Sequence, residues 1–469
     1  MAKFLMIAGT ASNVGKTLLS ACLCEAGRRC GMNIAPFKAQ NMSGSTVAQL
    51  NGAEVSTAQW FQTGGQTISV HMNPILVKPS ARDSSLLVRG DLECDNFMYP
   101  GSPRHRNRLK ALVLESAEEL ALRHDLVIIE GAGALAETNL SPFDLSNIWL
   151  ARALSSKIVL VSDLEHGGAL SSVVGTHCLM SEADAAMVVG FMLNRFVGRI
   201  GLLKPAISSL ERATSWPCLG IVPKLNGSFR FPWEDALCKP IHDVHTSAVL
   251  VVDLPFETSG AELSAFALEP TWSLTYAKVP PLVITRQLKL VIVPDCAPSV
   301  EAFGVLRMWL PFLMRAKTRG VAVLALGFAF HALSATPRVI ANAKGLCLFN
   351  VETVMLRSGR PLANCKCTLM GPLTMINGQA SVMCRKVGHP SNVLLRSANG
   401  IWGTFEGSTF GIGLVSSLLN DDFRRQLMKR SGLVSSITDC QSAIRNALRL
   451  AADEVINHFD DRLLSQLIG

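Results

Sequence analysis

The amino-acid sequence predicts an α/β protein with parallel sheets and two domains. The chain of 469 residues is about three times a typical domain length, and 49% of it is hydrophobic, which is enough for large cores. Short apolar runs alternate along the chain with amphipathic stretches of helical length. Since strands that alternate with helices form βαβ units, we expect parallel strands with helices on both faces of the sheet.

The first 225 residues carry the clearest alternation. We expect buried strands at Phe4–Ala8, Asn33–Phe37, Leu126–Glu130, Ile158–Val161, Met187–Leu193 and Cys218–Val222, and helices at Lys16–Arg29, Arg108–His124, Asp144–Leu154 and Leu202–Ala213. The polar segment Pro79–Asn107 interrupts this order, and we predict a loop-rich insertion there, either a lid or an ordinary loop.

A domain boundary is expected at residues 226–246. This segment contains prolines and a Gly-Ser pair and shows little periodicity, so we interpret it as a linker between a domain at 1–225 and a second at 247–469. The second domain repeats the alternation. Strands are predicted at Ala248–Asp253, Leu288–Pro294 and Val321–Ala325, with helices that end at Lys317, begin at Phe328 and run over Asp439–Ile468.

The composition limits the classes of binding partner and the cellular compartment that we expect for this protein. The formal net charge of +8 is spread along the chain, which favours small anionic molecules over nucleic acid. No apolar stretch reaches the roughly 18 residues that a membrane-spanning helix needs, and no secretory signal follows Met1. The 13 cysteines include no C-x-x-C pair, so we expect free thiols in a soluble cytoplasmic protein without a membrane partner.

The segment Gly9–Thr17 follows the first predicted strand and opens the first helix. This context is typical of a P-loop, although the first glycine lies one place further from the lysine than in the commonest pattern. We expect backbone N–H groups to cradle phosphate oxygens, Lys16 to reach the β- and γ-phosphates of ATP, and Thr17 to bind Mg²⁺. The predicted nucleotide-binding residues are Gly9, Thr10, Ser12, Val14, Gly15, Lys16 and Thr17.

Two carboxylates stand at the ends of later strands. Glu130 closes Leu126–Glu130 before a loop that contains glycine, and Asp163 follows Ile158–Ser162. In an open parallel sheet the carboxyl ends of the strands line the ligand crevice. We therefore predict that Glu130 binds Mg²⁺ together with Thr17 and that Asp163 belongs to the nucleotide site. A helix cap or a solvated turn is the alternative for each carboxylate.

Six collinear segments resemble the cobyric acid synthase family, whose synthetase half is similar to dethiobiotin synthetase. They are Gly9–Thr17, Ala35–Ser43, Met72–Pro79, Glu130–Leu140, Asp163–Gly168 and Gly190–Phe196. The resemblance runs through the whole chain and is densest in the first 225 residues. It implies a P-loop synthetase domain followed by a class I glutamine amidotransferase-like α/β domain.

The resemblance implies a reaction as well. Members of this family use ATP and Mg²⁺ to amidate the b, d, e and g carboxylates of adenosylcobyrinic acid a,c-diamide through acyl phosphates, which gives adenosylcobyric acid in cobalamin biosynthesis. By this resemblance the catalytic residues are Lys16, Lys38, Asn41 and Glu130, and Gln40, Asn73 and Lys78 also line the groove for the corrinoid polycarboxylate. Surface lysines and turn-forming asparagines are the alternatives for Lys38, Asn41, Asn73 and Lys78.

The second domain departs from the family pattern. Family glutaminases use a cysteine on a strand-to-helix turn, which a later histidine activates. This chain has Gly327 at the cysteine position, and within Ile401–Phe410 we assign the histidine position to Gly407. His331, on the helix after the turn, is predicted to be structural. We expect that glutaminase activity is lost and that nitrogen comes from free ammonia or from a glutaminase acting in trans.

Other interpretations of the P-loop stay open at this point. A cobyrinic acid a,c-diamide synthase shares the two-domain plan, but Gln40–Ser43 favours the cobyric acid enzyme. A partitioning-type ATPase switch usually has a second lysine early in the loop, where this chain has Thr10 and Ala11. A wholly inactive remnant is the third alternative. A homo-oligomer is compatible with each of them.

Overall fold

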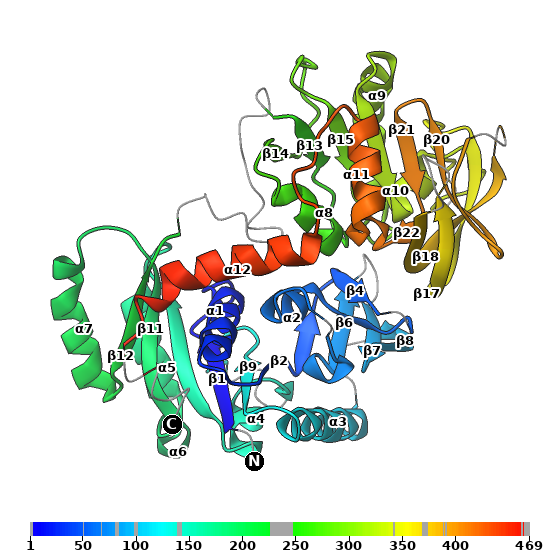
Figure 1. Ribbon diagram of the computed structural model, residues 1–469. Coiled ribbons are helices and arrows are strands. Elements are labelled where there is room, and N and C mark those ends of the chain that lie inside the picture. The colour runs from blue at the N-terminus through cyan, green and yellow to red at the C-terminus, as the bar shows by residue number, and fades with distance from the viewer. Residues whose placement is uncertain are drawn as a thin grey trace.

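The computed structural model describes residues 3–49, 51–66, 68–79, 84–97, 102–137, 143–225, 247–340, 343–367, 374–387, 389, 392–460 and 463. The predicted linker at 226–246 and the end of the segment Glu130–Leu140 lie outside the described residues. The chain is α/β, as predicted. One parallel sheet forms the centre of the first half, and a larger mixed sheet forms the centre of the second (Figure 1).

The first half is built around a six-stranded parallel sheet. Its strands are β1 (Lys3–Gly9), β2 (Ile34–Phe37), β9 (Leu126–Glu130), β10 (Lys157–Asp163), β11 (Val188–Phe196) and β12 (Cys218–Pro223), in the order β12-β11-β10-β1-β9-β2. The sequence analysis predicts each of them from its apolar run. After β1 the chain forms β2 and later β9, which lies between β1 and β2. It then crosses to the other side of β1 and forms β10. Ligands of such sheets bind where this order reverses, at the carboxyl ends of the strands.

Helices cover both faces of this sheet. The face that carries Leu5 and Ile7 packs against α1 (Lys16–Arg29) and the last helix, α12 (Cys440–Ile456). The face that carries Met6 and Ala8 packs against α3 (Pro103–Ala121), α4 (Ile148–Ala153), α5 (Ala169–Leu179) and α7 (Ile200–Thr214), and the short α6 (Glu182–Ala185) precedes β11. Successive strand residues point to opposite faces, so a continuous apolar run is what a strand buried on both faces requires.

Two small sheets flank the first half between β2 and α3. One contains β3 (Gln40–Met42), β6 (Ile75–Pro79), β7 (Ser84–Val88) and β8 (Asp91–Phe97); the other pairs β4 (Thr46–Ala48) with β5 (Glu54–Ser56), ahead of α2 (Thr57–Gln62) and a 3₁₀ turn at Val70–Met72. The hairpin β7–β8 corrects the prediction of a loop-rich segment at Pro79–Asn107. Its buried Leu86 and Leu87 pair with β6 on one side and β8 on the other, a short apolar signal among polar neighbours.

The second half contains a ten-stranded mixed sheet. The strands β14 (Leu274–Ala277), β13 (Val249–Val252), β15 (Leu290–Val293), β16 (Ala322–Leu326) and β21 (Thr409–Ile412) are parallel and adjacent in this order. The antiparallel part has β20 (Gly400–Glu406), β19 (Val393–Ser397), β17 (Val351–Cys367), β18 (Thr374–Val387) and β22 (Leu414–Val415). The sequence analysis predicts β13, β15 and β16 and misses β14 and the antiparallel part.

Four helices pack on the parallel strands of this second sheet. The face with Val249 and Leu324 carries α8 (Gly260–Ala267) and α11 (Asp421–Arg430). The opposite face, with Leu250 and Val323, carries α9 (Val300–Thr318) and α10 (Gly327–Leu333). The strand-to-helix turn between β16 and α10 thus lies at the carboxyl edge of the parallel strands.

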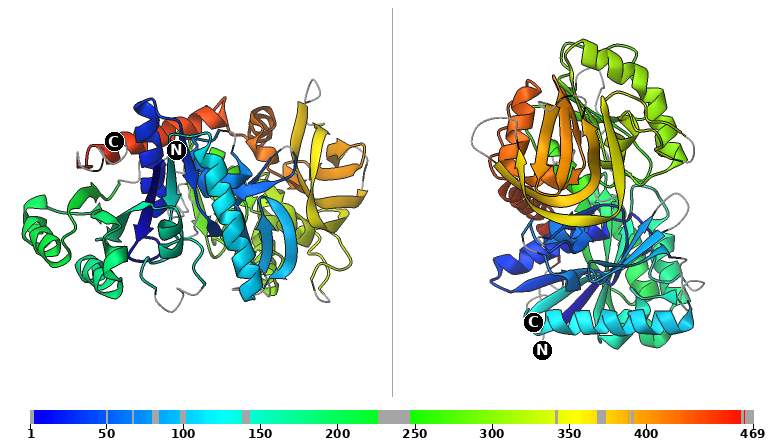
Figure 2. Two further views of the ribbon diagram at one scale, coloured as in Figure 1. Left: turned by 90° about the horizontal axis from the view of Figure 1, so that it is seen from below. Right: turned by 90° about the vertical axis from the view of Figure 1, so that its right-hand side faces the viewer.

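The helix α12 joins the end of the chain to the first half. It comes after the strands of the second half and lies against α1, as Figures 1 and 2 show. Its Ala452 and Val455 share a core with Leu19 of α1. Beyond the helix, the N–H of Asp460 donates to the carbonyl of Leu219 in β12. Residues that the sequence analysis assigns to the second domain therefore complete the core of the first half.

No helix among the described residues has the length and the apolar character needed to cross a membrane. Within the same residues Cys22, Cys24, Cys296 and Cys440 are buried free thiols. Burial raises the pKa of each of them, so they are poor nucleophiles.

A buried carboxylate in α8 makes the stability of the second half depend on pH. Glu262 is 2% exposed, and its Oε2 has no hydrogen-bond partner among the described residues. Burial raises the pKa of Glu262 from 4.5 to about 8. The folded protein thus holds this proton more tightly than the unfolded chain, and this contribution to stability is lost as the pH rises from about 4.5 to about 8.

We expect the free energy of unfolding of the variant Glu262→Gln to lack this dependence on pH. In urea unfolding, the free energy of unfolding of the wild type should fall relative to the variant between mildly acidic and mildly alkaline pH. Equal slopes against pH in the two proteins would contradict the assignment.

Candidate functional site

The P-loop connects β1 to α1 at the point where the strand order reverses. The N–H of Thr10 donates to Val161 O at 2.9 Å, which fastens the loop to β10. The Lys16 ammonium folds over the loop and donates to Ala11 O at 3.0 Å and to Gly133 O at 2.9 Å. The first turn of α1 contains no acidic residue. Since the first N–H groups of a helix attract anions, this geometry suits a phosphate.

Two glycines keep the loop tight. A Cβ at Gly9 would lie 2.9 Å from Lys16 Nζ. Gly15 has a φ of +98°, and a side chain there would overlap the amide of Asn194. Asn194, in β11, donates to Val14 O at 2.8 Å. The sequence analysis does not predict this role for Asn194, although a polar residue near the end of a buried strand is a usable signal.

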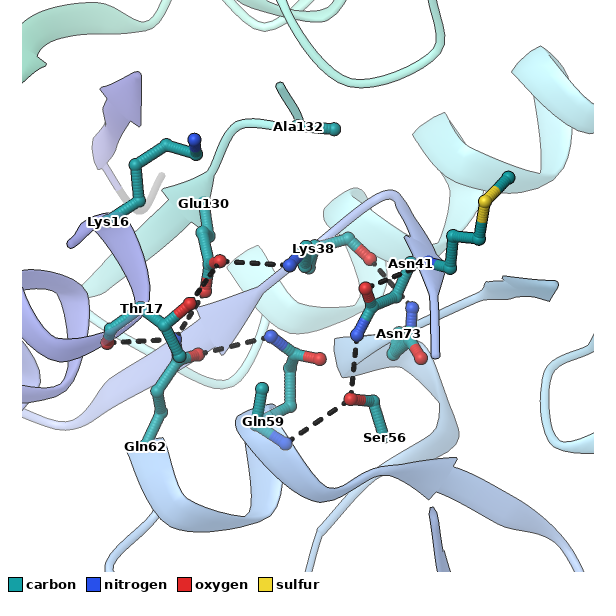
Figure 3. Close-up of polar contacts among 12 residues, drawn as sticks. Lys16, Thr17, Lys38, Asn41, Ser56, Gln59, Gln62, Asn73, Glu130 and Ala132 are labelled. Atoms are coloured by element: carbon teal, nitrogen blue, oxygen red, sulfur yellow. Dashed lines mark hydrogen bonds and ion pairs between the residues drawn. The ribbon is translucent and has the colours of Figure 1, made fainter. Parts of the chain in front are cut away.

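Glu130, the last residue of β9, lies between Thr17 of α1 and Lys38, which follows β2 (Figure 3). Its Oε1 accepts hydrogen bonds from Thr17 Oγ1 at 2.7 Å and from Lys38 Nζ at 2.9 Å, and its Oε2 accepts one from Gln62 Nε2 at 2.6 Å. Burial by itself raises the pKa of Glu130, but the Lys38 ammonium and the hydrogen bonds hold that pKa below its usual value. The carboxylate is therefore ionised and oriented although it is buried.

Gln62 and Asn147 complete this part of the site, and the sequence analysis misses both. Gln62 ends α2, a short helix whose sequence carries no local signal for a site. Asn147 precedes α4 and forms two hydrogen bonds with Ala132, in the loop after Glu130. Its Oδ1 accepts from Ala132 N–H at 3.1 Å, and its Nδ2 donates to Ala132 O at 2.7 Å. Such contacts join residues far apart in the chain, so only the fold reveals them.

The predicted residues Lys38 and Asn41 are both buried, and Lys38 contacts Glu130. Lys38 is 9% exposed and Asn41 is 5% exposed, so neither is a surface residue. Asn41 Nδ2 donates to Ser56 Oγ at 2.7 Å. Asn73 is also buried, and its Nδ2 donates to Lys38 O at 3.1 Å, so it supports the backbone that carries Lys38.

The other two predicted groove residues, Gln40 and Lys78, lie in the small sheet that contains β3 and β6. Gln40 begins β3 and pairs with Ile75 of β6. Lys78, near the end of β6, forms an ion pair with Glu54, with 2.5 Å between Nζ and Oε2. The structure thus brings Lys38 into contact with Glu130, pairs Asn41 with Ser56 and leaves Lys78 in a separate ion pair.

Asp163 ends β10, at the same edge of the sheet as Glu130, but has partners of its own. Its Oδ2 accepts from Arg195 Nη1 at 2.8 Å and lies 2.6 Å from His166 Nδ1. Burial raises the pKa of Asp163, but the N–H of Glu165, His166 and Arg195 together hold it below its usual value. Among the described residues, the hydrogen-bond partners of Asp163 do not include Thr17 or Glu130.

The strand-to-helix turn of the second half lies where the sequence predicts it. β16 ends at Leu326, and α10 begins at Gly327, whose φ is +47°. His331, in α10, is buried, and its Nδ1 lies 2.8 Å from Thr353 Oγ1. Burial lowers the pKa of His331 to about 4, so the ring is neutral at physiological pH.

The structure corrects the assignment of the histidine position to Gly407. This residue, with a φ of +58°, lies in the turn between β20 and β21. Val323 pairs with Thr409, so the turn lies at the edge where β16 begins, whereas the strand-to-helix turn lies where β16 ends. The residue of β21 next to that end is Ile412, which pairs with Leu326. The sheet register, which the sequence does not display, decides this point.

Comparison with known proteins identifies the family. Residues 5–234 match the family model described as the CobQ/CobB/MinD/ParA nucleotide binding domain. A cobyric acid synthase of Rhizobium etli (strain CIAT 652) is 32% identical over 499 aligned positions, which cover 100% of each chain. The chain belongs to the cobyric acid synthase family. A cobyric acid synthase of Brucella anthropi is 31% identical, and the match covers 96% of each chain.

The chain also resembles solved structures at lower sequence identity. A crystal structure of a glutamine amidotransferase covers 40% of this chain and 100% of its own, with 16% sequence identity and a TM-score of 0.33. Membership of the cobyric acid synthase family confirms the resemblance carried by the six collinear segments. The family model likewise confirms a nucleotide-binding domain around the P-loop.

Proposed function

We propose that this chain amidates the b, d, e and g carboxylates of adenosylcobyrinic acid a,c-diamide with ATP, as a step of cobalamin biosynthesis. The full-length similarity to cobyric acid synthases supports the corrinoid substrate, and the nucleotide-binding domain supports ATP. One observation carries the proposal. The buried Glu130 carboxylate accepts hydrogen bonds from both Thr17 of the P-loop helix and Lys38, the residue proposed to bind the substrate carboxylate, so the two places where reactants would bind share one group.

The residues of the P-loop fit a nucleotide with Mg²⁺. The tight loop requires Gly9 and Gly15, because a Cβ at Gly9 would crowd Ala11 O and Lys16 Nζ and one at Gly15 would overlap the Asn194 amide. The Thr17 hydroxyl and the Glu130 carboxylate, 2.7 Å apart, are the hard oxygen ligands that Mg²⁺ prefers. Lys16, which now donates to backbone carbonyls, is the cation for the phosphate oxygens. When bound, ATP supplies the phosphoryl group that turns a carboxylate into an acyl donor.

Lys38 and Asn41 are proposed to present the substrate carboxylate. A carboxylate that enters a buried groove needs a positive partner, and Lys38 is a buried cation 2.9 Å from Glu130. Asn41 is oriented by Ser56 and by the N–H of Met42, which donates to its Oδ1 at 2.9 Å. Asn73 acts indirectly, through the Lys38 backbone. A role for Asp163 in the nucleotide site is proposed as well, on its position at the neighbouring strand end.

We propose that the nitrogen comes from free ammonia or from a glutaminase in trans. Gly327 stands on the strand-to-helix turn with the left-handed φ of +47°, and glycine has no nucleophilic atom. The synthetase chemistry itself requires only ammonia at the activated carboxylate.

The purified chain, incubated with ATP, Mg²⁺ and the a,c-diamide, should therefore form amides with ammonium salt at raised pH and not with glutamine. Product masses report how many carboxylates react. Lys16→Ala is the matched control, and it should remove the ammonium-dependent product. Glutamine-driven product would contradict the loss of glutaminase activity, and absence of product with ammonium would contradict the proposed function.

We further propose that the protein works in the cytoplasm. Buried free thiols such as Cys22 and Cys24 are compatible with a reducing compartment. Gel filtration of the purified chain would establish whether it forms the homo-oligomer that the sequence analysis leaves open.

A further inference from the structure

The carboxylate of Asp295 fills the strand-to-helix turn of the second half. Asp295 follows β15, the strand next to β16, and its Oδ1 accepts two backbone hydrogen bonds. One comes from the N–H of Phe328 at 2.7 Å and the other from the N–H of Cys296 at 2.9 Å. The two donors belong to different strand ends, β16 and β15, so the sheet and not a single helix brings them together.

These two donors have the arrangement of an oxyanion hole. In hydrolases with a nucleophile on such a turn, one donor is the N–H of the residue after the nucleophile and the other comes from a neighbouring loop. Here Gly327 stands at the position of the nucleophile, Phe328 follows it, and Cys296 lies in the neighbouring loop. Both donor distances fall in the range of about 2.7–3.1 Å that such holes show.

We propose that Asp295 is an internal oxyanion, which occupies the anion-binding pair of the turn and closes it to an external ligand. The proposal is independent of the amidation reaction. It assigns to this turn an anion site whose ligand is part of the chain. A small carboxylate such as formate is the external molecule that matches the Asp295 side chain in charge and shape.

The observed position of the Asp295 carboxylate requires glycine at residue 327. A Cβ at Gly327 would overlap the Asp295 carboxylate. The Asp295 backbone is held as well, because its N–H donates to Ser259 Oγ at 2.7 Å and its carbonyl accepts from Thr258 N–H at 2.9 Å. The observed position of the carboxylate therefore requires a residue without a side chain at 327, and a cysteine at 327 would clash with the Asp295 carboxylate.

The first experiment removes the internal ligand and supplies an external one. The full-length variant Asp295→Ala should melt at a lower temperature than the wild type. Sodium formate should raise its melting temperature by several degrees more than sodium chloride at the same ionic strength. The wild type and Asp295→Asn, whose amide oxygen still fills the donor pair, should respond equally to the two salts. Equal responses of Asp295→Ala to formate and chloride would overturn the proposal.

A second experiment keeps the proposal testable if Asp295→Ala does not fold. Gly327→Ala should lower the melting temperature far more than Gly320→Ala, because Gly320 has a φ of +74° and nothing within 4 Å of an added Cβ. In an Asp295→Gly background, the cost of Gly327→Ala should fall to the cost of Gly320→Ala. An unchanged cost in that background would show that Asp295 does not occupy the turn.

Discussion

Replacement of Glu130 by glutamine should reduce ATP-dependent amidation by about 10²–10³-fold, the size of effect seen when a charged or polar group of a catalytic site is removed. The amide keeps the shape of the side chain but loses the charge that faces Lys38 at 2.9 Å and the second oxygen that Gln62 contacts at 2.6 Å. It is also a weaker ligand for Mg²⁺ than a carboxylate. Initial rates at several Mg²⁺ concentrations, with ammonium as the nitrogen source, would measure the loss.

Glu115→Gln is the matched control for this change. The Glu115 side chain is 60% exposed and pairs with Arg89 at 2.6 Å, so the same chemical change there removes only a surface ion pair. Its rate should equal that of the wild type. Amidation by Glu130→Gln within a few-fold of the wild type would exclude Glu130 from the metal and phosphoryl chemistry.

Val455→Asp should unfold or strongly destabilise the nucleotide-binding half, although residue 455 lies near the end of the chain. Val455 is fully buried and shares a core with Leu19 and Leu23 of α1, the helix that begins at the P-loop. An unpaired carboxylate in this core should lower the free energy of unfolding by about 4 kcal/mol. ATP binding should weaken in parallel. Thermal unfolding and nucleotide titration of the full-length variant would measure both effects.

The same helix provides a matched control. Leu450 is 60% exposed on α12, so Leu450→Asp introduces the same charge without burying it. That variant should unfold within about 0.5 kcal/mol of the wild type and bind ATP normally. Equal behaviour of the two variants would mean that α12 does not support the P-loop helix.

Much of the parallel architecture could be predicted from local sequence. The strand run Phe4–Ala8 and the helix Lys16–Arg29 appear in the structure within a residue of their predicted limits. A strand buried on both faces must be apolar at every position, which a short run displays directly. Local sequence does not predict the hairpin β7–β8, because Leu86 and Leu87 are the only buried side chains among those described in it and the other positions are largely polar.

The same distinction applies to the candidate site, where local sequence predicts some residues and not others. The P-loop is one contiguous segment whose backbone binds the ligand, so its order of residues can be recognised by eye. The partners of Glu130 come instead from three separate segments, and Gln62 gave no local signal. Local sequence points to Gly407 as the histidine position, because the register between β16 and β21 cannot be inferred from the residues of either strand.

The sequence by itself determined three things: that the chain has a P-loop, that it resembles the cobyric acid synthases, and that residue 327 is glycine where the family has cysteine. Each of these is a property of consecutive residues. Only the tertiary structure decided that Asp295 covers Gly327 and that α12 completes the core around α1. Both depend on side chains and segments that meet through sheet register and burial. Those contacts form between residues far apart in the chain, and no local pattern encodes them.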